Sequence, residues 1–137
     1  TISKPFAPHS IPGMIPAYQY DIGARGLSYT DSDYWNDGDG GYNDGWVGRN
    51  DGVDLEGSDD HPDIPFTVGW TEAGEWLGYT IQDVTPGTYE VSFSISAPEA
   101  GGIFFAQLEL IPWTDEVEKD HACFDSDRDF RTEGVII

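Results

Sequence analysis

The sequence predicts an all-β protein. The clearest observation is residues 88–97, where apolar and polar side chains alternate without a break, the period of a strand with one buried and one solvated face. Turn signals at Ala73-Gly74 and Pro86-Gly87 separate this stretch from two shorter apolar runs. No stretch has the apolar spacing of about 3.6 residues that marks an amphipathic helix. We therefore expect three antiparallel strands joined by tight turns in the middle of the chain.

The N-terminal half contains weaker strand signals. Residues 1–13 hold three prolines and no periodicity, which indicates an extended lead-in or strap. Residues 15–21 are expected to form a first strand, which Pro16 confines to a sheet edge or a strand start. Short strands are expected at residues 27–30 and 52–56. From residue 14 onward the chain is expected to form a single domain, 14–137.

The later part of the chain alternates in places and then loses its pattern. Residues 57–65 are expected to form an acidic loop, and residues 66–70 lead into the central strands. Residues 103–110 alternate again and predict another strand. Residues 111–137 are charged and weakly patterned, apart from a last short strand expected at 134–137.

The charge balance excludes several classes of partner. The 137 residues carry 26 acidic and six basic side chains, for a net charge of −20. Nucleic acids and anionic membranes are therefore excluded as partners, because binding their phosphates requires a basic surface. A neutral partner or a cation fits better. Aromatic residues make up 14% of the chain, which is typical of a folded domain rather than a disordered acidic tail. We expect a secreted β domain with a polar, ring-bearing surface.

The longest irregular region is residues 31–50, which are rich in aspartate, asparagine and glycine. Four aromatic residues lie in this region: Tyr34, Trp35, Tyr42 and Trp46. A loop of about twenty residues inside a compact domain is usually functional or disordered. Loops lie at the surface, so these rings cannot all belong to the core. We expect a binding site here.

Several segments occur in an order and at a spacing that match one known family. They are Pro5-Phe6, residues 11–13, Tyr20-Asp21, and residues 29–33, 52–56, 68–81, 86–89, 101–102 and 108–110. Together they resemble the family 6 carbohydrate-binding modules, which are non-catalytic domains of secreted polysaccharide-degrading enzymes. The resemblance covers roughly residues 5–110 and is strongest at residues 68–81.

The resemblance implies a fold, a function and a place for the site. It implies a two-sheet antiparallel β-sandwich, or jelly roll, with a sugar site in the loops at one end. It also implies a covalently attached glycoside hydrolase and a polysaccharide ligand such as a β-glucan, an agarose-type galactan or a xylan. The family's closing pattern is missing after Leu110, so the C-terminal part is divergent or incomplete. The carboxylates that hold the family's structural calcium are replaced by Pro16 and Tyr18.

The resemblance also indicates candidate carbohydrate-binding residues. The ring that forms one wall of the family's site best matches Trp46, with Tyr42 as the alternative. Trp113 is the ring available to stand opposite. A sugar ring stacks its C–H face on an indole or phenol, while its hydroxyls bond carboxylates and amides. Tyr34 and Trp35 are the other candidate rings in the loop at residues 31–50. Asp31 and Asp33 are its candidate hydrogen-bond acceptors.

Two alternatives remain. Calcium prefers several carboxylate and carbonyl oxygens, and Asp37 and Asp39 in the loop at residues 31–50 are candidate metal ligands. The chain would then be a calcium-stabilised structural or adhesion domain. Glu72 and Glu75 form a carboxylate pair of the kind that glycosidases use. They flank an expected turn, however, and so many acids produce such pairs by chance. We therefore expect a non-catalytic module.

Overall fold

The computed structural model describes residues 2–38, 43, 45, 48–99, 102–108 and 131–136. This part of the chain is built from strands with one short 3-10 helix, so the all-β class is confirmed. The elements are β1 (His9–Ile11), β2 (Met14–Ile15), η1 (Ala17–Gln19), β3 (Tyr29–Thr30), β4 (Leu55–His61), β5 (Ile64–Val68), β6 (Trp76–Leu77), β7 (Ile81–Val84), β8 (Ser92–Ser96) and β9 (Arg131–Ile136). Among the described residues, no helix has the length and apolarity needed to cross a bilayer.

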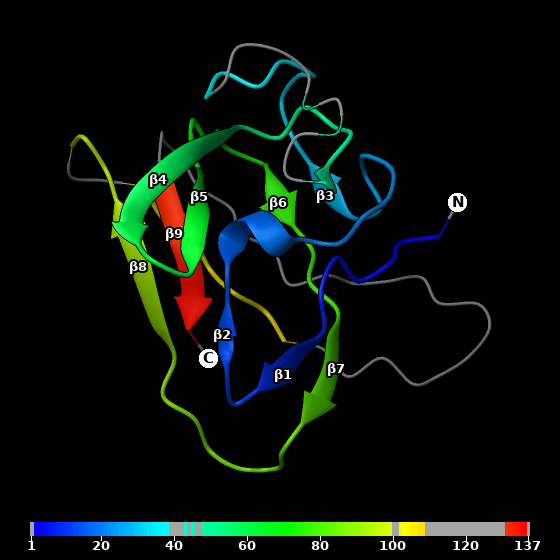
Figure 1. Ribbon diagram of the computed structural model, residues 1–137, viewed down its shortest axis with the longest axis vertical. Helices are drawn as coiled ribbons and strands as arrows, with labels where there is room; N and C mark the ends of the chain where they lie inside the picture. The colour runs from blue at the N-terminus through cyan, green and yellow to red at the C-terminus, as the bar shows by residue number, and fades with distance from the viewer. Residues whose placement is uncertain are drawn as a thin grey trace.

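The strands form three small sheets (Figure 1). The largest has five strands, in the order β2-β9-β5-β4, with β8 paired to the other edge of β9. β3 pairs with β6 in an antiparallel ladder, and β1 pairs with β7 in a parallel one. β9 is the centre of the large sheet because it pairs with three strands. The expected strand at residues 134–137 is therefore present and begins earlier, at Arg131.

The strands of the central region exist, but their expected pairing was wrong. β5, β6, β7 and β8 do not form one antiparallel run; they belong to three different sheets. β7 runs beside β1 instead, and the N–H of Thr85 donates to the carbonyl of Ile11 at 2.8 Å. Alternation fixes which face of a strand is buried, but it does not select the partner strand. The turn at Ala73-Gly74 is present, with Gly74 at φ +91°.

The expected acidic loop at residues 57–65 is a β-hairpin. β4 and β5 pair with Leu55 opposite Val68 and Gly57 opposite Phe66. The carboxylates of Asp59 and Asp60 point into solvent along the exposed part of β4. Acid density resembles a loop in sequence, but charged side chains are tolerated on the wet face of a strand. The prediction failed for that reason.

Two further strand predictions were wrong in detail. The strand expected at residues 15–21 ends after Ile15, and the chain continues as η1. Pro16 has a helix-compatible φ of −62°, and its carbonyl accepts a hydrogen bond from the Gln19 N–H at 2.9 Å. Of the expected strand at residues 103–110, residues 103–108 are not a strand, and residues 109–110 lie outside the described residues. Alternation alone does not make a strand, because its backbone also requires a partner, and within the described part no strand pairs with these residues.

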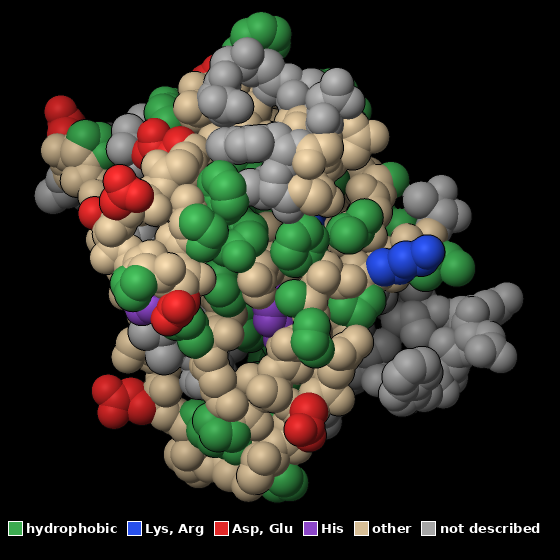
Figure 2. Space-filling view, in the orientation of Figure 1, with side chains coloured by type: hydrophobic (Ala, Val, Ile, Leu, Met, Phe, Trp, Pro, Cys, Tyr) green, Lys and Arg blue, Asp and Glu red, His purple; other side chains and the backbone are tan. Residues whose placement is uncertain are grey.

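The core lies between η1, the β3–β6 ladder and the β4–β5 hairpin. Its buried members are Ala17, Tyr20, Tyr29, Val53, Leu55, Val68 and Leu77, with Tyr18 and Tyr79 packed against them. The lead-in is bound to this body, since the backbones of Lys4 and Ile22 exchange two hydrogen bonds of 2.8 Å. On the face in Figure 2, hydrophobic side chains gather near the centre and acidic ones lie mainly toward the margins.

Candidate functional site

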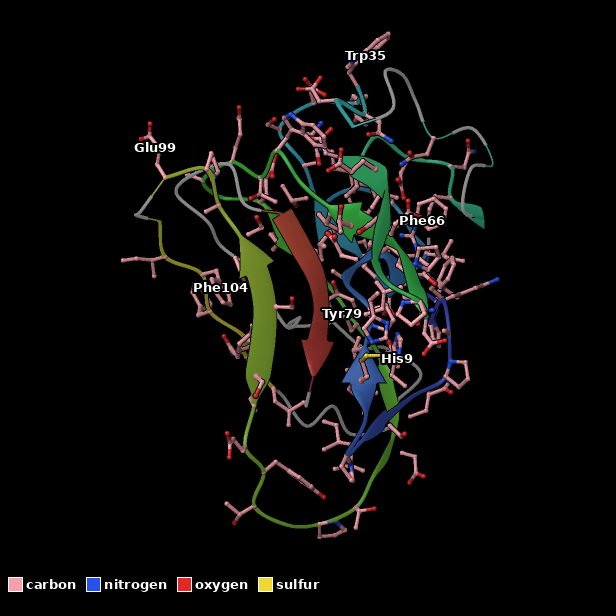
Figure 3. All side chains as sticks on the ribbon, turned by 60° about the vertical axis from the view of Figure 1, so that its left-hand side comes forward. His9, Trp35, Phe66, Tyr79, Glu99 and Phe104 are labelled. Carbon is pink, nitrogen blue, oxygen red and sulfur yellow. The ribbon has the colours of Figure 1, made fainter. Side chains whose placement is uncertain are left out.

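The candidate site lies at one end of the molecule, on residues 31–37, which directly follow β3 and begin the loop at residues 31–50 (Figure 1). Two neighbouring aromatic side chains are displayed there. Tyr34 is 59% exposed and Trp35 is 57% exposed. Figure 3 shows the Trp35 ring at the outer tip of this end, pointing away from the ribbon. Rings this exposed contribute little to a hydrophobic core, so core packing does not explain why they lie at these positions.

The local sequence explains how the segment presents these rings. The Oδ1 atom of Asp31 accepts a hydrogen bond from the Asp33 N–H at 3.2 Å. The Oδ1 atom of Asp33 in turn accepts from the Trp35 N–H at 2.6 Å. In both cases an aspartate bonds the backbone two residues further on, which is the bond that closes a local turn. Two such turns in succession place Tyr34 and Trp35 on the outside of a bend.

Carboxylates from two other segments hold the same backbone. The Oε1 atom of Glu75 accepts from the Ser32 N–H at 2.8 Å. The Oδ1 atom of Asp54 accepts from the Asp37 N–H at 2.7 Å. Together with the two local turns, the backbone amides of residues 32, 33, 35 and 37 each donate to a carboxylate. The ring-bearing segment is therefore fixed by four hydrogen bonds to carboxyl groups.

Close backbone packing fixes the segment further. A Cβ atom on Gly52 would lie 2.5 Å from the Cα of Tyr34. A Cβ atom on Gly38 would lie 2.1 Å from the carbonyl oxygen of Leu55. Such distances are far below van der Waals contact, so only glycine allows the segment to lie directly against the start of β4. Buried Asn36 completes this attachment, because its Oδ1 accepts from the N–H groups of Gly38 at 2.9 Å and Leu55 at 3.0 Å.

One cation lies beside the rings. The guanidinium carbon of Arg25 is 4.8 Å from the centroid of the Tyr34 ring, within the range of a cation–π contact. Its Nη2 atom donates to the Ser32 carbonyl at 2.9 Å and its Nη1 atom to the Asp33 carbonyl at 3.4 Å. Arg25 thus supports one side of Tyr34 and binds the backbone beneath it.

The carboxyl groups under the segment have displaced pKa values. Burial, and after it the charges of Glu75 and Asp54, raise the pKa of Asp31 to about 8, although the Asp33 N–H opposes this rise. Burial also raises the pKa of Asp54 to about 7, although the Asp37 N–H opposes this rise. The pKa of Glu75 is raised for the same first reason. Near neutral pH, Asp31 is therefore mostly protonated and can donate as well as accept a hydrogen bond.

A second polar network anchors the far end of the loop. Arg49 is buried and lies 3.3 Å from the Oδ2 atom of Asp51. Its guanidinium carbon lies 3.4 Å from the centroid of the Tyr20 ring, and its Nη2 atom donates to the Asp21 carbonyl at 3.0 Å. The Nδ2 atom of Asn43 donates to Asp51 at 2.8 Å. These contacts stabilise the fold rather than forming a surface for a ligand.

The predicted site residues have different locations. Tyr34, Trp35 and Asp33 lie together at the exposed end, as expected for a loop site. Asp31 lies there too, but it is only 4% exposed and its Oδ1 atom holds the backbone. Trp46, Tyr42, Trp113 and Asp39 lie outside the described residues.

The two alternatives from the sequence are a calcium site at Asp37 and Asp39 and a catalytic pair formed by Glu72 and Glu75. The side chain of Asp37, the described candidate metal ligand, is exposed. In the described ranges, no three His, Cys, Asp or Glu side chains are arranged to hold a metal ion. The Oε2 atom of Glu75 accepts from the Glu72 N–H at 2.8 Å, so this pair closes a turn.

Sequence reasoning missed the residues that attach the loop to the body. These residues, Asn36, Asp54 and Arg49, are buried and polar. Asn36 and Arg49 were counted only as part of the region 31–50, and Asp54 only as part of the expected strand 52–56. The available signal was Arg49, one of six basic residues in the chain, within an otherwise acidic loop. Comparison of the chain with protein-family models and with curated proteins finds no match.

Proposed function

We propose that this chain is a non-catalytic carbohydrate-binding module that binds a polysaccharide at the end carrying Tyr34 and Trp35. The observation that supports the proposal best is the pair of rings, each more than half exposed, on a segment whose backbone is fixed by four carboxylate hydrogen bonds. Exposed flat rings beside polar groups suit a pyranose, which has an apolar C–H face and a rim of hydroxyls.

The finer fold and the cellular setting belong to the same proposal. The β-rich architecture, with one five-stranded sheet and two short ladders, is compatible with a divergent two-sheet jelly roll. The likeness of residues 5–110 to family 6 modules supports secretion and attachment to a glycoside hydrolase. The net charge of −20 favours a neutral glycan over a polyanion.

The expected affinity is modest. One or two ring stacks with a few hydrogen bonds contribute about −4 to −7 kcal/mol, which corresponds to a dissociation constant between roughly 1 mM and 10 μM. Such weak binding is effective on a polymer, because repeated sugar units and tethering to an enzyme raise the effective concentration.

The double variant Tyr34→Ala/Trp35→Ala tests the site. Native affinity electrophoresis against laminarin, agarose, xylan and mixed-linkage glucan is expected to retard the wild-type protein on at least one polymer. The double variant is expected to lose that retardation, because the stacking surface is removed, and to keep its melting temperature within a few degrees, because exposed side chains contribute little to stability.

Phe105→Ala provides the matched control, since Phe105 is an exposed ring on a different part of the chain. It is expected to migrate like the wild type on each polymer. Absence of retardation of the wild-type protein on all four polymers contradicts the proposed function. Loss of retardation in Phe105→Ala, with the double variant unaffected, places the sugar site elsewhere.

A calcium-stabilised structural or adhesion domain is the second candidate. Its support is the proximity of the Glu75 and Asp54 carboxyl groups to Asp31, whose pKa their charges raise, although the described residues contain no three such groups arranged to hold a metal ion. One oxygen of each carboxyl group already accepts a backbone N–H: Oδ1 of Asp31, Oδ1 of Asp54 and Oε1 of Glu75. We therefore expect calcium to add little stability. Thermal melts in millimolar calcium and in chelator are expected to agree within a few degrees. A large calcium-dependent rise in Tm without glycan binding favours the second candidate instead.

A further inference from the structure

Glu75 joins two separate segments through one carboxylate. Its Oε1 atom accepts from the Ser32 N–H at 2.8 Å, and its Oε2 atom accepts from the Glu72 N–H at 2.8 Å. The second bond closes the turn 72–75, which the Glu75 N–H also closes by donating to the Glu72 carbonyl at 3.2 Å. Glu75 is only 9% exposed, so water competes weakly for these bonds.

We propose that Glu75 is the positioning residue of the glycan site: its carboxylate fixes Ser32 against the turn 72–75 and thereby sets the direction of Tyr34 and Trp35. The inference rests on the proposed function. Glu75 does not contact the sugar; it acts through the backbone of the ring-bearing segment.

The path from Glu75 to the rings is short. Glu75 holds the Ser32 N–H, Asp31 holds the Asp33 N–H, and Asp33 holds the Trp35 N–H. Of these three bonds, only the first comes from outside the segment. The local turns give the segment its shape, and Glu75 attaches that shape to the β6 side of the molecule, one residue before Trp76. A segment fixed before binding loses less conformational entropy when the sugar arrives.

The geometry requires a carboxylate at this position. Both oxygens of Glu75 accept a backbone N–H, whereas glutamine has one acceptor oxygen and a donor NH₂ group. In Glu75→Gln, one of the two backbone N–H groups therefore faces another donor. Glu72 differs, because only its backbone N–H and carbonyl take part in the bonds of the turn, while its side chain is exposed. Glu72→Gln is thus a matched control that removes a neighbouring carboxylate and keeps both bonds of Glu75.

The experiment compares wild type, Glu75→Gln and Glu72→Gln on the polymer that retards the wild-type protein. Glu75→Gln is expected to bind about tenfold more weakly, the effect of one lost buried hydrogen bond. Glu72→Gln is expected to bind within about twofold of the wild type. Melting curves identify a temperature at which all three proteins are folded, so that affinity and stability are read separately.

Amide NMR and hydrogen exchange report whether the bond from Ser32 to Glu75 is present and whether its loss reaches Trp35. In wild type, the Ser32 and Glu72 amides are expected to be shifted downfield and protected, because each donates to a buried carboxylate. In Glu75→Gln, the Ser32 amide is expected to move upfield and exchange faster, together with the Trp35 amide. If Glu75→Gln does not fold, an unprotected Ser32 amide in wild type still overturns the proposal.

The outcomes separate the two proposals. If the wild-type protein binds a glycan and Glu75→Gln binds it equally well, positioning by Glu75 is wrong and the proposed function stands. If Glu72→Gln and Glu75→Gln lose affinity equally, loss of negative charge explains the effect and positioning is again wrong. If the wild-type protein binds no glycan, the function itself fails.

Discussion

Replacement of Arg49 with leucine is expected to lower the free energy of unfolding by about 3–5 kcal/mol. Arg49 is 2% exposed and forms an ion pair with Asp51, which is buried as well. The variant leaves the Asp51 carboxylate in a low-dielectric environment without its positive partner. It also leaves the carbonyl groups of Tyr20 and Asp21 without their guanidinium donor. Urea unfolding followed by tryptophan fluorescence measures the change.

A second substitution tests whether the uncompensated charge causes the loss. In Arg49→Leu/Asp51→Asn the buried charge is gone, while the asparagine oxygen can still accept from Tyr20 Oη and Asn43 Nδ2, as Asp51 does at 2.8 Å in both cases. The double variant is expected to recover at least about 1 kcal/mol relative to Arg49→Leu. Arg25→Leu is the control at an accessible arginine, and it is expected to cost about 1 kcal/mol or less.

A small effect would contradict this account of the loop. If Arg49→Leu unfolds within 1 kcal/mol of wild type, the network of Arg49, Asp51 and Asn43 does not anchor the loop. A double variant less stable than Arg49→Leu would show that the Asp51 charge is stabilised by other groups.

The strands could be predicted from sequence because their signals are local. Alternation at residues 88–97 identified β8, and Ala73-Gly74 marked the turn before β6. The partner of each strand could not be predicted in this way. β7 pairs with β1, some seventy residues earlier, and their register joins Ile81 to His9. Such pairings depend on how the whole chain packs, which a local period does not record.

The candidate site, too, could be predicted from the sequence only in part. The exposure of Tyr34 and Trp35 followed from their place in a polar, glycine-rich loop. The role of Glu75 did not, because it acts on Ser32, which lies 43 positions earlier in the chain. Asp54 was visible only as part of an expected strand. Long-range bonds from side chains to backbone leave no periodic trace in the sequence, so the support of the site was found in the structure alone.

Stability is expected to fall as the pH rises from about 4 to about 8, and Asp31 is expected to be the main cause. Burial raises the pKa of Asp31 to about 8 in the folded protein, whereas an unfolded aspartate titrates near about 3.9. Between these values the folded state binds more protons than the unfolded state, so the free energy of unfolding decreases with pH. The favourable contribution of Asp31 is complete below about pH 4 and is lost as the pH rises through about 8.

Asp31→Asn is expected to abolish much of this dependence. The asparagine oxygen can accept the Asp33 N–H as Oδ1 does now, and no charge has to be buried at high pH. The variant is expected to match the wild type at pH 4 and to exceed it by about 2 kcal/mol at pH 8.5, measured by urea unfolding at both values. This is less than the full shift implies, because neighbouring carboxyl groups relax when one of them ionises.

Asp59→Asn controls for net charge, since it removes one exposed carboxylate from the β4–β5 hairpin, away from this cluster. Its effect on stability is expected to be small at both pH values. If Asp31→Asn and wild type keep a constant difference from pH 4 to 8.5, Asp31 does not carry the dependence. If Asp31→Asn is the less stable protein at pH 8.5, the ionised carboxylate is stabilised by its surroundings. In that case Asp31 holds the Asp33 N–H as a charged carboxylate.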